Sequence, residues 1–459
     1  MNIAGENSPV EAGHDDSVWI AVRPWYALGV LIVAIIFGFI DRQIIVLVVE
    51  PMKQELGLTD FQIGSLQGLV PALFAVVAGF PLAWLADRVD RRWLLIACIL
   101  FWSAATALRG LAGGFNELLV YTVGIAVGEA VLTPIIYSLI PDLFSGRRRD
   151  FANFIFFAMT VAGVGLGMML GGAVIGTIDS LRPLLPDGVA ALSGWRLACL
   201  AVAVPGIIVA LLVLPVPSGR TSLRRAAAGG EAASMSGMGA YLRRHARPFL
   251  TVNTAFGLYA FSFATLMLWL PVAMMRDMNI PASEVGVRLG TTITIAAAAG
   301  IGFAMLTASW WRRIAPGRHL LRALSSCMAL APLPLVGLLW ATTPLQAYVL
   351  AGASFTFALC GTAFSPSLLQ DMSPPLLRAR VAAVMMITYA AAAGLGPMVT
   401  GRLSDALAPD GGSLMTIVVC LAAPCLALTS LFYRLAESPV ARMTREFGTS
   451  ADGMPEQNH

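Results

Sequence analysis

The feature that most limits the possible folds is a long apolar run that recurs along almost the whole chain. A helix needs roughly 20 apolar residues to cross the hydrocarbon core of a bilayer, and runs of that length alternate here with short polar breaks. Only 12% of the residues are charged, against about 25% in soluble domains, so little of the surface faces water. The sequence therefore predicts an all-α integral membrane protein with twelve spans. We place them near residues 22–50, 61–87, 92–112, 115–143, 150–177, 196–216, 247–274, 283–308, 319–340, 344–372, 377–406 and 412–433.

The basic residues are distributed unevenly between the predicted loops. If the N-terminus is cytoplasmic, 22 of the 30 lysine and arginine residues fall on the cytoplasmic side and 7 on the outer side. Cytoplasmic loops carry an excess of these residues, so the bias predicts that both termini are cytoplasmic and that the number of spans is even. In this assignment Arg109 lies on the outer side, whereas Arg42 lies inside the first span.

The chain divides into two halves of similar size that also resemble each other. We expect an N-terminal tail at 1–21, a six-helix bundle at 22–216, a linker at 217–246, a second bundle at 247–434 and a C-terminal tail at 435–459. Gly128-Glu129-Ala130 with Pro134 recurs as Gly361-Thr362-Ala363 with Pro366, at offsets of 232 to 233 residues. Because a parallel repeat of this kind places substrate sites where the repeats meet, it predicts solute binding between the two bundles.

Motifs of soluble enzymes and nucleotide-driven pumps are absent from the sequence. The single lysine, Lys53, follows Met52, whereas a phosphate-binding loop needs glycine before its lysine. The metalloprotease pattern HExxH and the hydrolase pattern GxSxG do not occur. We therefore expect no enzymatic activity, no cofactor, no metal and no nucleic-acid partner, and we expect transport to draw on an ion or solute gradient.

Three ionisable residues lie deep inside apolar sequence: Asp41 and Arg42 in the first span and Glu129 in the fourth. A charge near the bilayer midplane costs several kcal/mol, so such residues usually face a cavity or one another. Neighbouring side chains on a helix diverge by about 100°. We therefore expect Arg42 to reach toward Glu129 while Asp41 points to another part of the cavity. Gly38, within one turn of both, leaves room beside them.

These three residues admit two interpretations. In the first, Asp41 and Glu129 carry a proton, and Arg42, which stays charged, pairs with them or with an anionic substrate. In the second, they form a structural salt bridge that joins two helices. We favour the first, because three deep charges are a costly means of joining two helices.

The second span ends in a cluster of charges, from Ala83 to Arg92. We expect Asp87, with Arg88 and Arg91, to form a conformational latch by pairing with a basic residue or a helix N-terminus of a neighbouring helix. Such a latch would stabilise the state in which the cytoplasmic side is closed. The alternative, that the arginines only signal topology, leaves the acid among them without a role.

Glycines and scattered polar residues provide weaker signals. The glycines of the fifth and eleventh spans predict close helix packing, with hinging as the alternative. Several other residues are candidates to line a cavity, and ordinary packing or lipid contact is the alternative for each. They are Thr122, Asn253, Tyr259, Phe263, Thr362 and Tyr389, with Met267, Met385 and Met386.

On these motifs the chain resembles transporters of the major facilitator superfamily. The segment Ala83 to Arg92 is similar to that family's motif G-x-L-x-D-R-x-G-R-R, with Ala83 and Asp90 in place of two glycines. The run Gly163-x3-Gly167-x3-Gly171-Gly172 is similar to an antiporter-associated motif, with Met168 where proline is usual. The resemblance covers essentially the whole chain and implies two six-helix bundles around a cavity that opens alternately to each side.

Three further features are similar to spinster-type transporters, which are linked to sphingolipids and lysolipids. They are Asp41-Arg42 followed by Leu58 to Gly64, Gly128-Glu129-Ala130 followed by Ser138 to Phe144, and Gly394 to Pro397 followed by Gly401 to Asp405. Thr122 stands where the family often has an arginine, which leaves Arg42 as the sole deep cation.

The resemblance implies a bacterial transporter that acts as a monomer in the inner membrane. We expect secondary, proton-coupled transport of an amphipathic anion or of a lysolipid- or sphingolipid-like molecule, with membrane lipids around it. A drug or organic-anion transporter of the same superfamily is the alternative. A non-transporting membrane sensor is a second alternative.

Overall fold

The protein is described here by a computed structural model that places residues 14–86, 88–217, 238–373, 377–407 and 411–452. All regular secondary structure in these residues is helical. Within them, twelve helical segments are long and apolar enough to cross a membrane. The predicted all-α membrane fold with twelve spans is therefore confirmed.

The helices fall into an N-terminal half (residues 14–217) and a C-terminal half (residues 238–452). The first half contains α1 (His14–Leu47), α2 (Val49–Leu56), α3 (Asp60–Gln67), α4 (Leu69–Ala86), α5 (Arg91–Arg109), α6 (Phe115–Glu129), α7 (Leu132–Leu143), α8 (Gly146–Leu181), η1 (Arg182–Leu184), α9 (Asp187–Ala190), α10 (Gly194–Ala203) and α11 (Pro205–Val213). The second half contains α13 (Met238–Arg244), α14 (Ala246–Met278), α15 (Ala282–Ile314), α16 (His319–Leu330), α17 (Pro332–Gly337), η3 (Leu338–Trp340), α18 (Pro344–Asp371), α19 (Arg378–Leu407) and α20 (Leu414–Asp452).

Several spans consist of two helices, and the breaks have identifiable causes. Pro205 begins α11 and Pro332 begins α17, and a proline cannot donate the N–H that would continue the preceding helix. The second span breaks at Gly68, between α3 and α4. A Cβ added to Gly68 would collide with the backbone carbonyl of Gly394 in α19, so this position has no room for a side chain.

The two halves approach each other most closely at glycines. Gly165 of α8 lies against Gly290 of α15, and Gly172 lies against Gly286 in the same helix pair. A Cβ at any of these four positions would meet the backbone of the opposite helix. The close packing that the glycines of the fifth span predict is therefore confirmed, and the small residues let helices of different halves touch.

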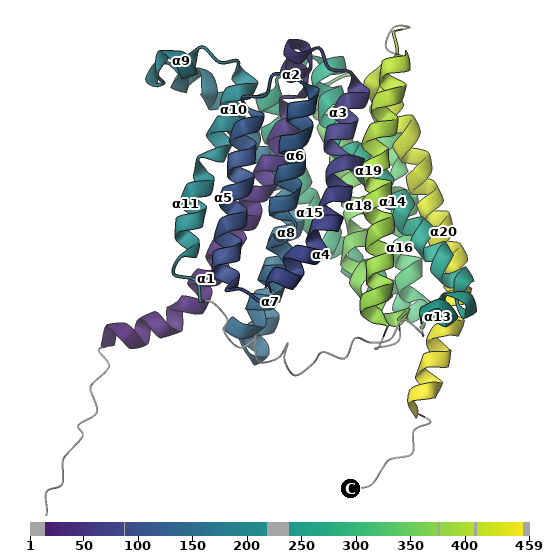
Figure 1. The fold of residues 1–459 in the computed structure, drawn as a ribbon. Helices are drawn as coiled ribbons and strands as arrows, with labels where there is room; N and C mark the ends of the chain where they lie inside the picture. The colour runs from purple at the N-terminus through teal and green to yellow at the C-terminus, as the bar shows by residue number, and fades with distance from the viewer. Residues whose placement is uncertain (1–13, 87, 218–237, 374–376, 408–410, 453–459) are drawn as a thin grey trace, which may run out of the picture.

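The molecule has two distinct ends along the helix axes (Figure 1). The start of α1, helix α13 and the end of α20 lie at one end, which we call the terminal end, and α2 and α9 lie at the other, which we call the α2 end. Helix α20 continues to Asp452, so it extends through most of the segment that the sequence assigned to a C-terminal tail.

Candidate functional site

An ion pair joins the first and fourth spans. Arg42 of α1 donates from Nε to Oε2 of Glu129, the last residue of α6, over 2.5 Å. The Glu129 side chain is 3% exposed, whereas the Arg42 side chain is 59% exposed. The second carboxylate oxygen, Oε1, is buried and has no hydrogen-bond partner in the described part of the chain. A Cβ added to Gly38 would lie 3.5 Å from that oxygen, so the glycine leaves space beside the carboxylate.

The neighbouring carboxylate, Asp41, turns toward a different helix, α5. It is 1% exposed and accepts hydrogen bonds from Thr106 Oγ1 at 2.5 Å and from Arg109 Nη2 at 2.7 Å. Arg109 itself is 2% exposed. Two adjacent residues of α1 therefore form two separate ion pairs with two different helices, because their side chains leave the helix in different directions.

The conclusion that Arg42 is the sole deep cation was wrong, because the side chain of Arg109 is also buried and paired with an acid. Arg109 is the last residue of α5, and helical side chains tilt toward the N-terminus of their helix. The tilt carries the guanidinium back into the bundle, where Asp41 compensates its charge. The sequence held one signal for this, because Arg109 lies inside the predicted span 92–112.

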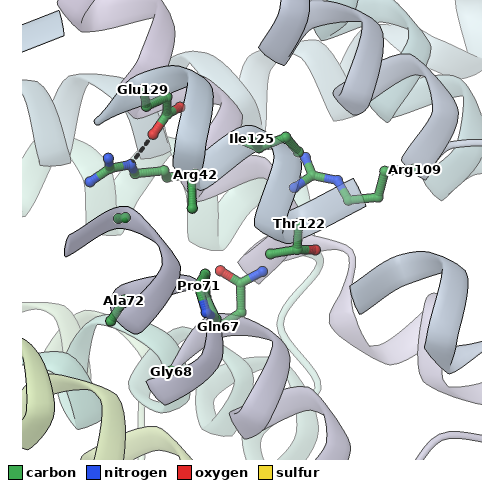
Figure 2. A pocket seen from close by; sticks show the side chains of 11 residues that line it. Arg42, Gln67, Gly68, Pro71, Ala72, Arg109, Thr122, Ile125 and Glu129 are labelled. Carbon is green, nitrogen blue, oxygen red and sulfur yellow. Dashed lines mark hydrogen bonds and ion pairs between the residues drawn. The ribbon is translucent and has the colours of Figure 1, made fainter. Parts of the chain in front are cut away.

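One cavity of about 220 Å³ is bordered by the Arg42–Glu129 pair and by Arg109, the cation of the second pair (Figure 2). Arg42 and Glu129 line it together with Arg109, Thr122 and Gln67. Thr122, predicted as a cavity residue, is 7% exposed and lies on this wall. With both carboxylates ionised, the two arginines and two acids are neutral as a group. Protonation of either acid leaves one net positive charge beside the cavity.

The remaining predicted cavity residues lie in the C-terminal half, on α14, α18 and α19. Asn253 Nδ2 of α14 donates to Thr388 Oγ1 of α19 at 2.9 Å. The ring of Tyr259 stacks on that of Phe263, with centroids 5.7 Å apart. Tyr389 packs against Phe256, with centroids 5.0 Å apart. Asn253 Oδ1 and the Tyr259 hydroxyl are buried without a hydrogen-bond partner among the described residues, so the role of these residues in lining a cavity stays a prediction. The side chain of Thr362 lies outside the described residues.

A second cavity, of about 190 Å³, lies in the C-terminal half and is almost entirely apolar. Two of the methionines that the sequence analysis singled out, Met385 and Met386, line it, whereas Met267 packs against the core. The other lining residues are Val252, Phe256, Leu368, Leu369 and Tyr433. This cavity therefore contrasts with the one beside Arg42 and Arg109, which is lined by charged side chains.

The predicted latch at the end of the second span is only partly described. Asp87 lies outside the described residues. The guanidinium of Arg88 lies 3.6 Å above the ring of Trp84. Arg91 is 6% exposed and donates to Asp142 Oδ2 at 3.2 Å, which joins α5 to α7 inside the N-terminal half. The latch stays a prediction.

An ionic cluster that no sequence pattern indicated joins the two halves at the α2 end. Arg276 of α14 donates to Glu50 Oε1 of α2 at 2.5 Å and to Asp60 Oδ2 of α3 at 2.7 Å. Ser404 Oγ of α19 also donates to Asp60, at 2.6 Å. These partners are 216 to 344 positions apart in sequence, so no local pattern points to them.

A carboxylate of one half also caps a helix of the other. The two oxygens of Asp405, near the end of α19, accept the backbone N–H groups of Asp60 and Phe61, each at 2.8 Å. These N–H groups belong to the first turn of α3 and have no partner within their own helix. A negative charge at a helix N-terminus is stabilising, so Asp405 holds the halves together at this end.

Comparisons with known proteins agree on one family. The family model described as Major Facilitator Superfamily matches residues 31–397. An MFS-type efflux pump of Mycolicibacterium smegmatis is 26% identical over 90% of this chain and 94% of its own length. The sphingosine-1-phosphate transporter SPNS2 of Xenopus tropicalis is 27% identical, but the match covers 54% of this chain and 46% of that protein.

Solved structures share the fold. A bacterial homologue of the human lysosomal transporter spinster, in an inward-facing and unoccupied conformation, is similar with a TM-score of 0.72. The sequence identity is 23%, and the match covers 93% of this chain and 98% of the other. A second structure, described as a bacterial homologue of spinster in an inward-facing and occupied conformation, is 24% identical over 93% of this chain and 98% of the other, with a TM-score of 0.69.

Proposed function

We propose that this chain, which belongs to the Major Facilitator Superfamily of transporters, couples proton movement to the transport of an amphipathic anion or lipid by alternating access. The observation that carries this proposal is the Arg42–Glu129 ion pair beside a polar cavity. The acid can take a proton and the base can bind an anion, so one pair links the two events.

The coupling step follows from the geometry of the pair. Glu129 Oε1 is buried, has no hydrogen-bond partner among the described residues and accepts the proton. Protonation removes the negative charge that compensates Arg42, whose exposed guanidinium then attracts an anionic headgroup. By linkage, a bound headgroup in turn raises the affinity of Glu129 for its proton.

Asp41 is the second proposed proton carrier, and its environment differs from that of Glu129. Its two oxygens already accept hydrogen bonds from Thr106 and Arg109. Removing the charge of Asp41 would leave the buried Arg109 uncompensated, which is costly. We therefore expect Glu129 to take its proton first, and Asp41 to do so only when helix movement separates it from Arg109.

The proposed substrate class rests on the contrast between these two cavities. Two arginines border the cavity of the N-terminal half, and the cavity of the C-terminal half is apolar. A molecule with an anionic or zwitterionic headgroup and an acyl chain matches both. The likeness to a sphingosine-1-phosphate transporter and to a spinster homologue supports a lysolipid or sphingolipid.

Flux into proteoliposomes tests this function. We expect a pH gradient to drive uptake of a lysolipid by the purified protein, and Glu129→Gln to abolish the dependence on the gradient. Asp41→Asn should reduce it as well. Full proton-dependent transport by both variants would contradict the proposed coupling. Arg313→Gln, at an exposed arginine of α15, is the matched control and should transport normally.

A second candidate function is the export of drugs or organic anions. The likeness to an MFS-type efflux pump over 90% of this chain favours it. The two functions separate in a thermal-shift screen of the purified protein with lysolipids, organic anions and cationic dyes. Stabilisation by dyes without any response to lysolipids would favour export of drugs.

A further inference from the structure

A short sequence motif recurs in both halves at the terminal end. Ser138-Leu139-x-x-Asp142 at the end of α7 is repeated, 229 residues later, as Ser367-Leu368-x-x-Asp371 at the end of α18. In the N-terminal half, Asp142 accepts a hydrogen bond from Arg91, which is the first residue of α5. This bridge fixes the start of one helix to the end of another.

The corresponding bridge is missing from the C-terminal half. Helix α16, which corresponds to α5, begins with His319 instead of an arginine. Histidine is mostly neutral at pH 7, so it supplies little charge to Asp371. The nearest arginine along α16, Arg322, pairs with Glu437 of α20 at 3.0 Å. Within the described part of the chain, Asp371 makes no hydrogen bond or close ion pair, and only longer-range charge interactions with His319 and Arg378 act on its carboxylate.

A cavity of about 330 Å³ occupies the place of the missing bridge. Asp371 lines it together with Arg318, His319 and Thr444, between the start of α16 and the ends of α18 and α20. Nδ1 of His319 is buried and has no hydrogen-bond partner among the described residues. The apolar part of the wall consists of Leu320, Leu321, Leu368 and Val440. The cavity thus presents one carboxylate, one guanidinium and an apolar wall.

We propose that this cavity binds a phosphoester that carries a primary amine, which is the headgroup chemistry of an aminophospholipid. The ammonium group takes the position of the missing cation and donates charge-assisted hydrogen bonds to Asp371. The phosphate lies against Arg318, whose guanidinium suits phosphate oxygens, and against the imidazole of His319. In the C-terminal half, the lipid amine pairs with Asp371 in the way that Arg91 pairs with Asp142 in the N-terminal half.

This site is separate from the proposed transport function. It lies among α16, α18 and α20, whereas the proton-coupling pair lies on α1 and α6. The site includes His319, the first residue of a candidate membrane span, so we expect it at the level of the lipid headgroups. The wall residues Leu320 and Val440 then contact the glycerol and the start of the acyl chains. Failure of transport in proteoliposomes would leave this proposal intact.

Thermal unfolding of the purified full-length protein in detergent tests the proposal. We compare phosphatidylethanolamine, phosphatidylglycerol with the same acyl chains, and free phosphoethanolamine. We expect the ethanolamine lipid to raise the unfolding temperature most and to bind about tenfold more tightly than the glycerol lipid, because only it donates to Asp371. Equal stabilisation by free phosphoethanolamine would support the site and assign it to a soluble ligand.

Two variants act on the site in opposite ways. Asp371→Asn removes the acceptor for the amine and should abolish the preference for phosphatidylethanolamine. His319→Arg restores the bridge of the N-terminal half, so it should stabilise the lipid-free protein and also abolish the preference. Asp150→Asn, at an exposed aspartate of α8 at the same end, is the control and should behave as the wild type. An unchanged preference in both Asp371→Asn and His319→Arg would overturn the proposal.

Discussion

At the scale of single residues, the Asp41–Arg109 pair is the most completely buried ion pair of the candidate site. Both side chains are at most 3% exposed, and their closest atoms are 2.7 Å apart. Removing both charges from water is expensive, and their attraction offsets this cost only while both partners are present. Two apolar side chains of similar volume would stabilise the contact between α1 and α5 equally well. The presence of a charged pair therefore points to a function and not to a need for stability.

The first prediction concerns this pair. Arg109→Gln leaves the Asp41 carboxylate buried without a cation and should lower the free energy of unfolding by about 3–5 kcal/mol. The double variant Asp41→Asn, Arg109→Gln removes both charges and should recover much of that loss. Thermal unfolding of the purified protein measures the cycle. Additive losses in the double variant would show that the two side chains do not interact.

At the scale of helices, α3 connects the ionic contacts between the two halves at the α2 end with the cavity beside Arg42. Its first residue, Asp60, contacts Arg276 and Ser404 of the other half. Its last residue, Gln67, lines the cavity beside Arg42. Gly68, which follows directly, is pressed against Gly394 of α19. A movement of α3 that opens the α2 end therefore also changes the wall of the cavity.

The second prediction is that this ionic cluster holds the α2 end closed. Arg276→Gln together with Asp405→Asn removes the charges that join the halves and should shift the population toward states open at this end. The shift is about tenfold for each 1.4 kcal/mol lost. Spin labels can be attached at Asn116→Cys on α6 and Leu345→Cys on α18. Double electron–electron resonance should then give longer distances between the labels than in the protein without the two charge substitutions.

Arg288→Gln is the matched control for this measurement. Arg288 lies on α15, in the same half as Arg276, and its pair with Glu284 stays within one helix. Its side chain is 59% exposed, so the pair contributes little to stability. Unchanged distances in the double variant at Arg276 and Asp405 would show that the glycine contacts between the halves suffice to keep this end closed.

At the scale of the whole molecule, the third prediction concerns orientation. The start of α1 and the end of α20 lie at the same end of the bundle, as an even number of spans requires (Figure 1). The bias of 22 of 30 basic residues toward one side predicts that this end is cytoplasmic. A green fluorescent protein fused after residue 459 should fluoresce, and alkaline phosphatase inserted at Gly188 in α9 should be active. The reverse pattern would contradict the orientation.

The sequence by itself determined the parts of this protein that depend on local hydropathy. The twelve spans follow from which side chains tolerate lipid, and the same reasoning predicts the depth of Asp41, Arg42 and Glu129. The pairing of Arg42 with Glu129 was also accessible, because the direction of a side chain follows from its place on a helix. The glycines of α8 predicted close packing for a different reason, since a residue without a side chain lets backbones approach, but they did not indicate which helix is the partner.

Only the tertiary structure decided which distant residues meet. The count of basic residues placed Arg109 at the outer end of its span but did not show that its side chain turns into the bundle. A long side chain at a helix end can turn either way, and here Asp41 decides the direction. The cluster of Arg276, Glu50 and Asp60 joins helices of different halves. The contacts of such a cluster depend on how packed helices are rotated and shifted against one another. That arrangement is a property of the whole bundle. Hydropathy is summed along one segment at a time, so it does not predict how the helices are arranged against one another.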